Sequence, residues 1–222
     1  MIVIVDYGVG NLRSIQNMLA RAGHEATIAG DVAAIRAATK LILPGVGHFR
    51  YGMEALRANG AADALTEQVI GRGVPILGIC LGAQLLGRRS DEGDVAGLGW
   101  VPMDVVAFDR ARLRPTDKVP HMGWTDTEVT PGGLFEGLEP RARFYYVHSF
   151  HFRCDDPALV ISTAWHGYPI ASGIHHRNIF GVQFHPEKSH RFGQQVLRNF
   201  AAMERAAIDA LSGARPQAEA TR

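Results

Sequence analysis

The stretch that decides the fold is VPILGICLG, residues 74–82, in which an apolar run leads directly into a cysteine flanked by glycines. The run 74–79 is typical of a strand that is buried on both faces of a parallel sheet. Gly78 and Gly82 stand two residues either side of Cys80, the spacing of a sharp strand–turn–helix elbow around a nucleophile. Such an elbow places the sulfur at a helix start, which favours the thiolate over the thiol. The alternative interpretation is a buried core cysteine, the usual fate of a free thiol.

A second segment, GVQFHPEKS at residues 181–189, supplies candidate partners for this nucleophile. Pro186 biases His185 toward an extended backbone, in which residues two apart point to the same side. Glu187 can therefore orient the His185 imidazole while the imidazole faces the thiol. A nucleophile, a base and a carboxylate that orients the base form a catalytic triad. Alone, a His-Pro-Glu sequence would be interpreted as a surface turn, but together with the elbow it favours the triad.

Strand and helix patterns alternate through the first half of the chain. Apolar runs at 2–5, 26–29, 41–43 and 74–79 alternate with helical spacing at 12–22, capped by Asn11, and at 56–70, interrupted at 59–60. This order predicts an α/β fold with a mostly parallel central sheet and helices on both faces. The second half predicts further, partly antiparallel strands at 101–108, 147–152, 160–163 and 179–184, and a closing helix over 192–203. We expect one domain over 1–205, then the end of the last helix and a disordered tail over 206–222.

Composition narrows the class of protein. The 222 residues carry a net charge of +1, so the chain lacks the excess of basic residues that is typical of nucleic-acid-binding proteins. Two cysteines, Cys80 and Cys154, make no disulfide framework, which indicates a reducing compartment. The start of the chain, residues 1–6, resembles a first strand rather than a signal peptide, and the apolar stretch 73–87 is too short and glycine-rich to span a bilayer. We expect a cytoplasmic protein that binds neither nucleic acid nor membrane.

No pattern in the sequence calls for a cofactor or a metal. Gly8-Val9-Gly10 follows the first strand, but Arg13 stands where a dinucleotide fingerprint needs its third glycine, and no phosphate-binding loop is present. Ordinary polar roles are expected for two histidine pairs that lack a cysteine or carboxylate at ligand spacing, His148/His151 and His175/His176.

The elbow and the His185-Pro186-Glu187 segment together resemble the catalytic triad of class I glutamine amidotransferases, which have a flavodoxin-like fold. The resemblance runs from about residue 1 to about residue 205. Within that family the chain is most similar to the glutaminase subunits of imidazole glycerol phosphate synthase. The narrower likeness depends on four stretches: PGVG at 44–47, Gln84 with the two leucines after it, PHMGW at 120–124, and YYVHS at 145–149. Three departures are Ala83, where the family often has methionine, Thr125, where it usually has asparagine, and Ser149-Phe150, which replaces a common Thr-Tyr pair.

The resemblance assigns roles to several groups of residues. Cys80 is the expected nucleophile, His185 the base and Glu187 its orienting carboxylate. The 44–47 stretch could be a simple turn, but its glycines also permit an amide to be turned toward an oxyanion. The remaining assignments are an oxyanion hole from Gly45, Val46, Gly47 and the Leu81 amide, and glutamine binding by Gln84, Glu92, Ser149 and Phe150.

The resemblance also implies a reaction and a partner. Glutamine would be hydrolysed to glutamate and ammonia, and the ammonia would pass to a (β/α)8-barrel cyclase subunit in a heterodimer. That complex, a lyase, would form imidazole glycerol phosphate and aminoimidazole carboxamide ribotide (AICAR) for histidine biosynthesis. The side facing the barrel is expected to carry four residues: Asn11, Trp124, Tyr145 and Lys188.

Two alternatives stay open at this point. The chain could serve a different synthase, such as one for pyridoxal phosphate or for surface-sugar amidation, and a pulldown would then find that synthase. It could also be a catalytically silent binding module on the same scaffold. Labelling by a glutamine analogue would distinguish the silent module from an enzyme.

Overall fold

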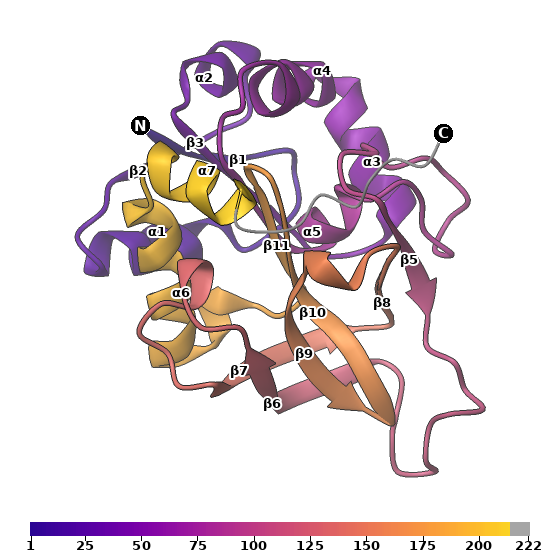
Figure 1. Ribbon diagram of the computed structural model, residues 1–222. Coiled ribbons are helices and arrows are strands. Elements are labelled where there is room, and N and C mark those ends of the chain that lie inside the picture. The colour runs from indigo at the N-terminus through magenta and orange to yellow at the C-terminus, as the bar shows by residue number, and fades with distance from the viewer. Residues whose placement is uncertain (214–222) are drawn as a thin grey trace.

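The structure, a computed structural model, describes residues 1–213. Parallel strands form one half of a mixed sheet (Figure 1). Their order is β2-β1-β3-β4-β11. Their bounds are β1 Ile2–Val5, β2 Ala26–Ala29, β3 Lys40–Gly45, β4 Ile76–Cys80 and β11 Ile179–Val182. Every apolar run predicted as a strand in the first half of the chain is confirmed. The sheet thus brings the ends of β3, β4 and β11, which carry PGVG, the elbow and the His185 segment, to one edge.

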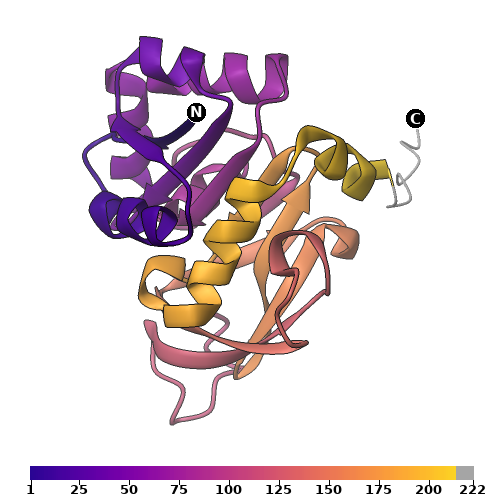
Figure 2. The ribbon, with the colours of Figure 1, turned by 90° about the vertical axis from the view of Figure 1, so that its left-hand side faces the viewer.

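Helices cover both faces of the parallel strands, because successive side chains of a buried strand point to opposite sides. Ile2 and Ile4 pack on the face covered by α1 and α6, whereas Val3 and Val5 pack on the opposite face. Helix α1 lies beside α6 (Figure 2). The helices of the first face are α1 Leu12–Arg21 and α6 His190–Ala202, and those of the second are α2 Val32–Ala37, α3 Phe49–Ala58, α4 Ala61–Thr66 and α5 Leu81–Leu85.

Two helix predictions need adjustment. The helical segment expected over 56–70 begins earlier, at Phe49, and breaks as predicted at Asn59 and Gly60, where Gly60 has φ 73°. After α4 the chain continues as a π-helical turn, η1 Glu67–Gly71. Asn11 does precede α1, but its side chain makes no capping hydrogen bond.

The other half of the sheet is antiparallel and continues in the order β11-β10-β9-β6-β7, with β5 and β8 paired to its side. The strands are β5 Met103–Ala107, β6 His121–Val129, β7 Arg141–His148, β8 Phe150–Cys154, β9 Val160–His166 and β10 Tyr168–His176. The single strand expected over 147–152 is wrong. The chain changes partners at Ser149, since His148 pairs with His121 of β6 whereas Phe150 pairs with Ala107 of β5.

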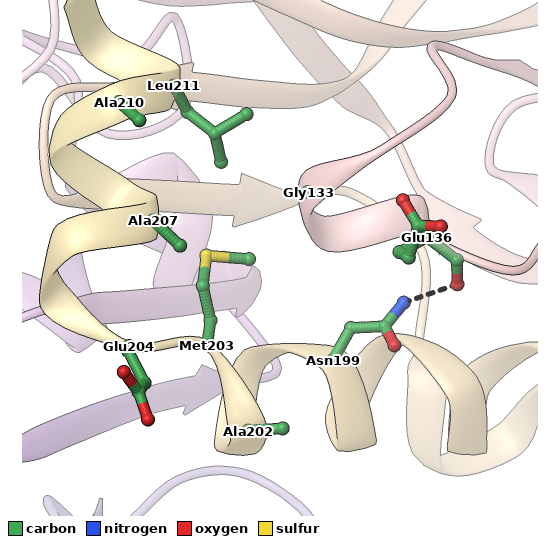
Figure 3. Close-up of a pocket in the computed structure, with 9 residues that line it drawn as sticks. All are labelled: Gly133, Glu136, Asn199, Ala202, Met203, Glu204, Ala207, Ala210 and Leu211. Atoms are coloured by element: carbon green, nitrogen blue, oxygen red, sulfur yellow. Dashed lines mark hydrogen bonds between the residues drawn. The ribbon is translucent and has the colours of Figure 1, made fainter.

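The described chain ends in a further short helix, α7 Arg205–Gly213, whose Ile208 is buried in the core. A groove of about 780 Å³ lies between α6, α7 and the turn η2 Gly133–Phe135. Figure 3 shows the Met203 and Leu211 side chains in this groove, and Asn199 Nδ2 donates to the Glu136 carbonyl oxygen at 2.8 Å. Of the segment 206–222 predicted as a helix end and a tail, residues 206–213 belong to α7 and residues 214–222 lie outside the described residues. Among the helices within 1–213, none has the length and apolar character needed to cross a bilayer.

Candidate active site

The elbow around Cys80 has the strained geometry that its sequence predicts. Cys80 ends β4 with φ 53° and ψ −114°, a conformation that side chains rarely adopt, and α5 begins at the next residue. The start of α5 packs so closely on the neighbouring strand β3 that a Cβ on Gly82 would lie 1.8 Å from the Leu43 carbonyl oxygen. A Cβ on Gly78 would lie 2.6 Å from the Ala83 Cα. Both glycines are therefore required by close backbone approach, and the turn presents the sulfur at the sheet edge.

The neighbouring strand brings the predicted oxyanion segment to the same edge. Gly45, the last residue of β3, pairs in parallel register with Cys80. The Tyr7 hydroxyl, buried beneath this strand end, donates to the Pro44 carbonyl oxygen at 2.7 Å. Leu81 is the first residue of α5, so its backbone N–H has no acceptor within the helix. The 45–47 segment at the end of β3 and the Leu81 amide at the start of α5 therefore lie at the same sheet edge as Cys80.

A pocket of about 360 Å³ opens over the elbow. It brings together most of the residues singled out in the sequence: Val46, Gly47, Cys80, Leu81, Gln84, Glu92, Ser149, Phe150 and His185. Gly45 does not line it, and Glu187 lies behind His185. Pro120, Val147 and His148 complete the wall, although no site role was predicted for any of these three.

His185 and Glu187 form a buried pair beside the pocket. His185 Nδ1 lies 2.9 Å from Glu187 Oε1, and both side chains are almost fully buried. Nε2 makes no hydrogen bond to a nitrogen or oxygen of the described residues, so this nitrogen is left for the sulfur side of the site. Burial alone would lower the pKa of His185, but interactions with Cys80 and Glu187 outweigh it and raise the pKa to about 9. At neutral pH the ring is therefore an imidazolium next to the sulfur.

Gln84 and Glu92 occupy defined places on the pocket wall. Gln84 Nε2 donates to the Phe150 carbonyl oxygen at 3.3 Å and to Gln183 Oε1 at 3.1 Å, which leaves its own carbonyl oxygen for a ligand. Glu92 Oε2 accepts from the Phe49 backbone N–H at 2.8 Å, at the first turn of α3. Glu92 alone would be interpreted as a solvated loop acid, so only the folded chain shows that its carboxylate is held at the pocket.

Sequence reasoning missed Gln183, which lies within the quoted 181–189 segment. Its Nε2 lies 3.8 Å from Cys80 Sγ, and its side chain is completely buried. On another side of the sulfur, the Val147 carbonyl oxygen lies 3.9 Å from Sγ. A fully buried glutamine is uncommon, so its burial would have marked Gln183 as a candidate site residue. That burial cannot be predicted from the sequence around position 183.

Three polar residues, His148 on the pocket wall with His121 and Thr125 behind it, form what we call the histidine chain. The Phe150 carbonyl can only accept, so His148 donates from Nδ1, at 2.7 Å. His148 Nε2 then accepts from His121 Nδ1 at 3.0 Å, and His121 Nε2 accepts from the Thr125 hydroxyl at 2.8 Å. Burial, with neighbouring histidines, lowers the pKa of His121 to about 4 and that of His148 well below its usual value. Both rings are therefore neutral and each has a fixed tautomer.

The histidines have polar and packing roles in the described part of the chain. Phe108 makes edge-on or tilted ring contacts with four of them: His121, His148, His151 and His166. Within 1–213 no group of three histidine, cysteine or acidic side chains is arranged to hold a metal ion.

Three of the four predicted interface residues lie together. Trp124 of β6 pairs with Tyr145 of β7, with ring centres 6.0 Å apart. Lys188 Nζ lies 5.7 Å from the Tyr145 ring centre, and His190 stacks on Trp124 at 5.1 Å. Asn11 comes from the turn before α1 and makes no ring contact or side-chain hydrogen bond with these residues.

Comparison with known proteins shows which family the chain resembles in sequence. A model of the family described as glutamine amidotransferase class-I matches residues 3–203. Imidazole glycerol phosphate synthase subunit HisH 2 of Pseudomonas aeruginosa is 46% identical over 206 residues, covering 91% of this chain and 100% of that protein. The HisH subunit of Bdellovibrio bacteriovorus is 45% identical, covering 90% and 99%. The HisH subunit of Moorella thermoacetica is 46% identical, covering 94% and 98%.

Solved structures support the fold at lower identity. A crystal structure of a glutamine amidotransferase superposes with a TM-score of 0.67 at 20% identity, covering 88% of this chain and 98% of that one. A structure of PurLQS from Thermotoga maritima gives 0.65 at 22% identity, covering 90% and 96%.

Proposed function

Because the chain belongs to the class-I glutamine amidotransferases, and within them to the family of the imidazole glycerol phosphate synthase subunit HisH, we propose that it hydrolyses glutamine through Cys80, His185 and Glu187. The observation that carries this assignment is the pocket in which a strained cysteine elbow meets a buried His185–Glu187 pair. A catalytically silent module would have no need of either feature.

The first half of the reaction forms a thioester. The Cys80 thiolate attacks the side-chain amide carbon of glutamine, and the carbonyl oxygen becomes an oxyanion. Backbone amides of the 45–47 segment and of Leu81 stabilise that charge. The His185 imidazolium gives its proton to the amide nitrogen as the carbon–nitrogen bond breaks, so that ammonia leaves and a γ-glutamyl thioester remains.

The second half regenerates the thiolate. His185, now neutral, accepts a proton from water as the water oxygen attacks the thioester carbon. The tetrahedral intermediate releases the Cys80 thiolate and glutamate, and His185 is again an imidazolium. Glu187 holds the ring by the 2.9 Å contact to Nδ1 throughout, which keeps Nε2 as the nitrogen that exchanges protons.

The amino-acid end of glutamine is bound on the far wall of the pocket. Glu92 presents a carboxylate to the α-ammonium group, and the Gln84 carbonyl oxygen can accept from the same ammonium. Ser149, which separates β7 from β8, and Phe150, the first residue of β8, both line the pocket. These contacts are available to both thioester-forming and thioester-hydrolysing steps, so they set substrate affinity more than rate.

The ammonia is consumed by a second subunit. We propose a (β/α)8-barrel cyclase that docks over Trp124, Tyr145 and Lys188 and uses ammonia to form imidazole glycerol phosphate and AICAR. The cluster offers a partly exposed aromatic pair beside a cation, and Met122, two residues before Trp124, is exposed as well. Relatives that share this length and sequence bear the name of the same synthase subunit, so a role in another synthase is not favoured.

The test is steady-state ammonia release from glutamine in three states: the chain alone, the complex with the cyclase, and the complex with the cyclase and its nucleotide ligand. We expect slow release by the chain alone and faster release in the complexes. Removing one oxyanion hydrogen bond costs about 10²–10³ in rate, which is the scale of activation expected if docking turns an amide of the 45–47 segment inward.

Each outcome bears on a different part of the proposal. Absence of ammonia release in all three states would overturn the glutaminase assignment. Equal turnover in all three would leave the triad in place but exclude a switch at the 45–47 segment. Release that increases only with a different synthase would overturn the proposed partner.

A further inference from the structure

Gln183 lies two residues before His185, and its side-chain amide reaches the same sulfur, Cys80 Sγ. It follows the last residue of β11, and its backbone N–H donates to the Ser172 carbonyl oxygen at 2.8 Å. Its side chain is completely buried. A buried amide costs free energy unless its donors and acceptor are satisfied, so the partners of this side chain indicate what it does.

The hydrogen bonds around Gln183 fix which end of its amide faces the sulfur. The Phe150 carbonyl oxygen can only accept, so the Gln84 atom at 3.3 Å from it must be the amide nitrogen. That nitrogen also lies 3.1 Å from Gln183, which must therefore present its oxygen to Gln84. The Gln183 NH₂ group is then left pointing at Cys80 Sγ, 3.8 Å away. A backbone carbonyl thus determines the orientation of both glutamines.

The sulfur has a hydrogen-bond acceptor and a hydrogen-bond donor among its neighbours. The Val147 carbonyl oxygen, 3.9 Å from Sγ, can accept a hydrogen bond from the thiol but repels a thiolate. The Gln183 N–H favours the thiolate instead, because a hydrogen-bond donor stabilises the anionic sulfur more strongly than the neutral thiol. This N–H therefore offsets the unfavourable carbonyl at the moment when the sulfur carries charge.

We propose that Gln183 is a thiolate-positioning residue, which donates a hydrogen bond to Cys80 Sγ, holds the sulfur in its attacking position and stabilises its anionic form. The inference rests on the proposed function, since it takes Cys80 as the nucleophile. Gln84 has a second task in this arrangement. Besides lining the substrate pocket, it orients the Gln183 amide.

The test measures thiolate formation directly rather than activity. In a Cys154→Ser background, the rate at which iodoacetamide alkylates Cys80 is followed across pH, because only the thiolate displaces iodide. Gln183→Met keeps the side chain unbranched and of similar length but removes the donor. A hydrogen bond to a charged group is worth enough to move the midpoint of this profile upward by about one pH unit. Gln68→Met is the matched control, since Gln68 is also a buried glutamine but lies in η1, away from the pocket.

Both results are informative if the variants fold, as checked by circular dichroism. A midpoint raised in Gln183→Met and unchanged in Gln68→Met supports the proposal, and an unchanged midpoint in Gln183→Met overturns it. If Gln183→Met does not fold, Gln183→Glu retains the size and the acceptor for Gln84. It should raise the midpoint further, because an oxygen replaces the N–H at the sulfur, and an unchanged midpoint there also overturns the proposal. Failure of the proposed function would look different, as glutamine hydrolysis that survives Cys80→Ala.

Discussion

At the scale of single residues, the two cysteines of the chain have different chemistry. Burial first, and then the charges of Asp155 and Asp156, raise the pKa of Cys154 to about 12, so this thiol stays protonated at neutral pH. Cys80 instead stands in the elbow beside the His185 imidazolium. Cys80→Ala should therefore abolish ammonia release from glutamine by the complex, whereas Cys154→Ser should leave it largely intact.

The control for this prediction supplies ammonia directly. The complex carrying Cys80→Ala should still form the cyclase product from added ammonium salt, because the barrel subunit is untouched. Glutamine-dependent activity that persists in Cys80→Ala would contradict the assignment of the nucleophile.

The raised pKa of His185 predicts an alkaline limit to activity. The imidazolium must donate a proton to the departing ammonia, so kcat/KM should fall as pH rises through about 9, where the ring loses that proton. Glu187→Gln removes one interaction that raises this pKa, so the falling limb should move to lower pH. His185→Ala should cost more than Glu187→Gln, since a single acid–base group contributes about 10²–10⁴ in rate. A limb that stays in place in Glu187→Gln would show that Glu187 does not act through His185.

At the scale of elements, the end of β3 is held from below by Tyr7. Its hydroxyl donates to the Pro44 carbonyl, and a Cβ on Gly45 would lie 2.5 Å from the Tyr7 oxygen. Tyr7→Phe leaves a buried acceptor unpaired, which should lower the free energy of unfolding by about 1–3 kcal/mol. Because the next peptides would stabilise an oxyanion only in the transition state, kcat should fall with little change in KM.

Urea unfolding and steady-state kinetics on the same variant check this prediction. Tyr51→Phe is the control, since Tyr51 is 57% exposed on α3 and its hydroxyl makes no hydrogen bond with the described residues. Equal losses of kcat in the two variants would indicate that the Tyr7 hydroxyl does not position the end of β3 for catalysis.

Elements with uniform local patterns could be predicted from the sequence, and those defined by distant partners could not. The strands β1, β3 and β4 contain continuous apolar runs and are buried, so their burial could be predicted from the local sequence. The edge strand β2 was recognised from a similar pattern, although it is only partly buried. Strand β6 mixes polar residues with a glycine, and β10 contains Pro169 and Gly173, so both were missed although the sheet holds them firmly. Within the site, the elbow and the triad segment were visible as motifs. Gln183, Tyr7 and the histidine chain gain their roles from partners distant in the sequence, except where Thr125 meets His121.

At the scale of the whole molecule, neutral buried histidines should make the fold sensitive to acid. The pKa of His121, about 4, and that of His148 both lie below the value of about 6.5 expected in the unfolded chain. Between these values the unfolded state binds more protons, so stability is lost as pH falls from about 6.5. His121 alone corresponds to about 3 kcal/mol between pH 7 and pH 4.

His185 acts in the opposite direction. Its folded pKa is raised to about 9, so its contribution is fully present below about pH 6.5 and is lost as pH rises through 9. The midpoint of thermal unfolding should therefore be highest near neutral pH. His148→Gln should make the melting temperature fall less steeply on the acid side of this pH profile. His24→Gln, which lies outside the histidine chain, should leave the profile unchanged. An acid side equally steep in His148→Gln would mean that other groups control acid unfolding.

The histidine chain also makes the molecule observable by proton NMR. The two imidazole N–H protons, on His121 and His148, are each buried in a hydrogen bond, so they should exchange slowly with water and give separate resonances downfield of the backbone amides. Thr125→Val would remove the hydroxyl that donates to His121 and should shift the His121 resonance more than the other. The histidine chain ends at the Phe150 carbonyl in the glutamine pocket on one side and at Thr125, next to Trp124 of the proposed interface, on the other. The His148 resonance would therefore report glutamine binding and the His121 resonance partner docking, without any added probe.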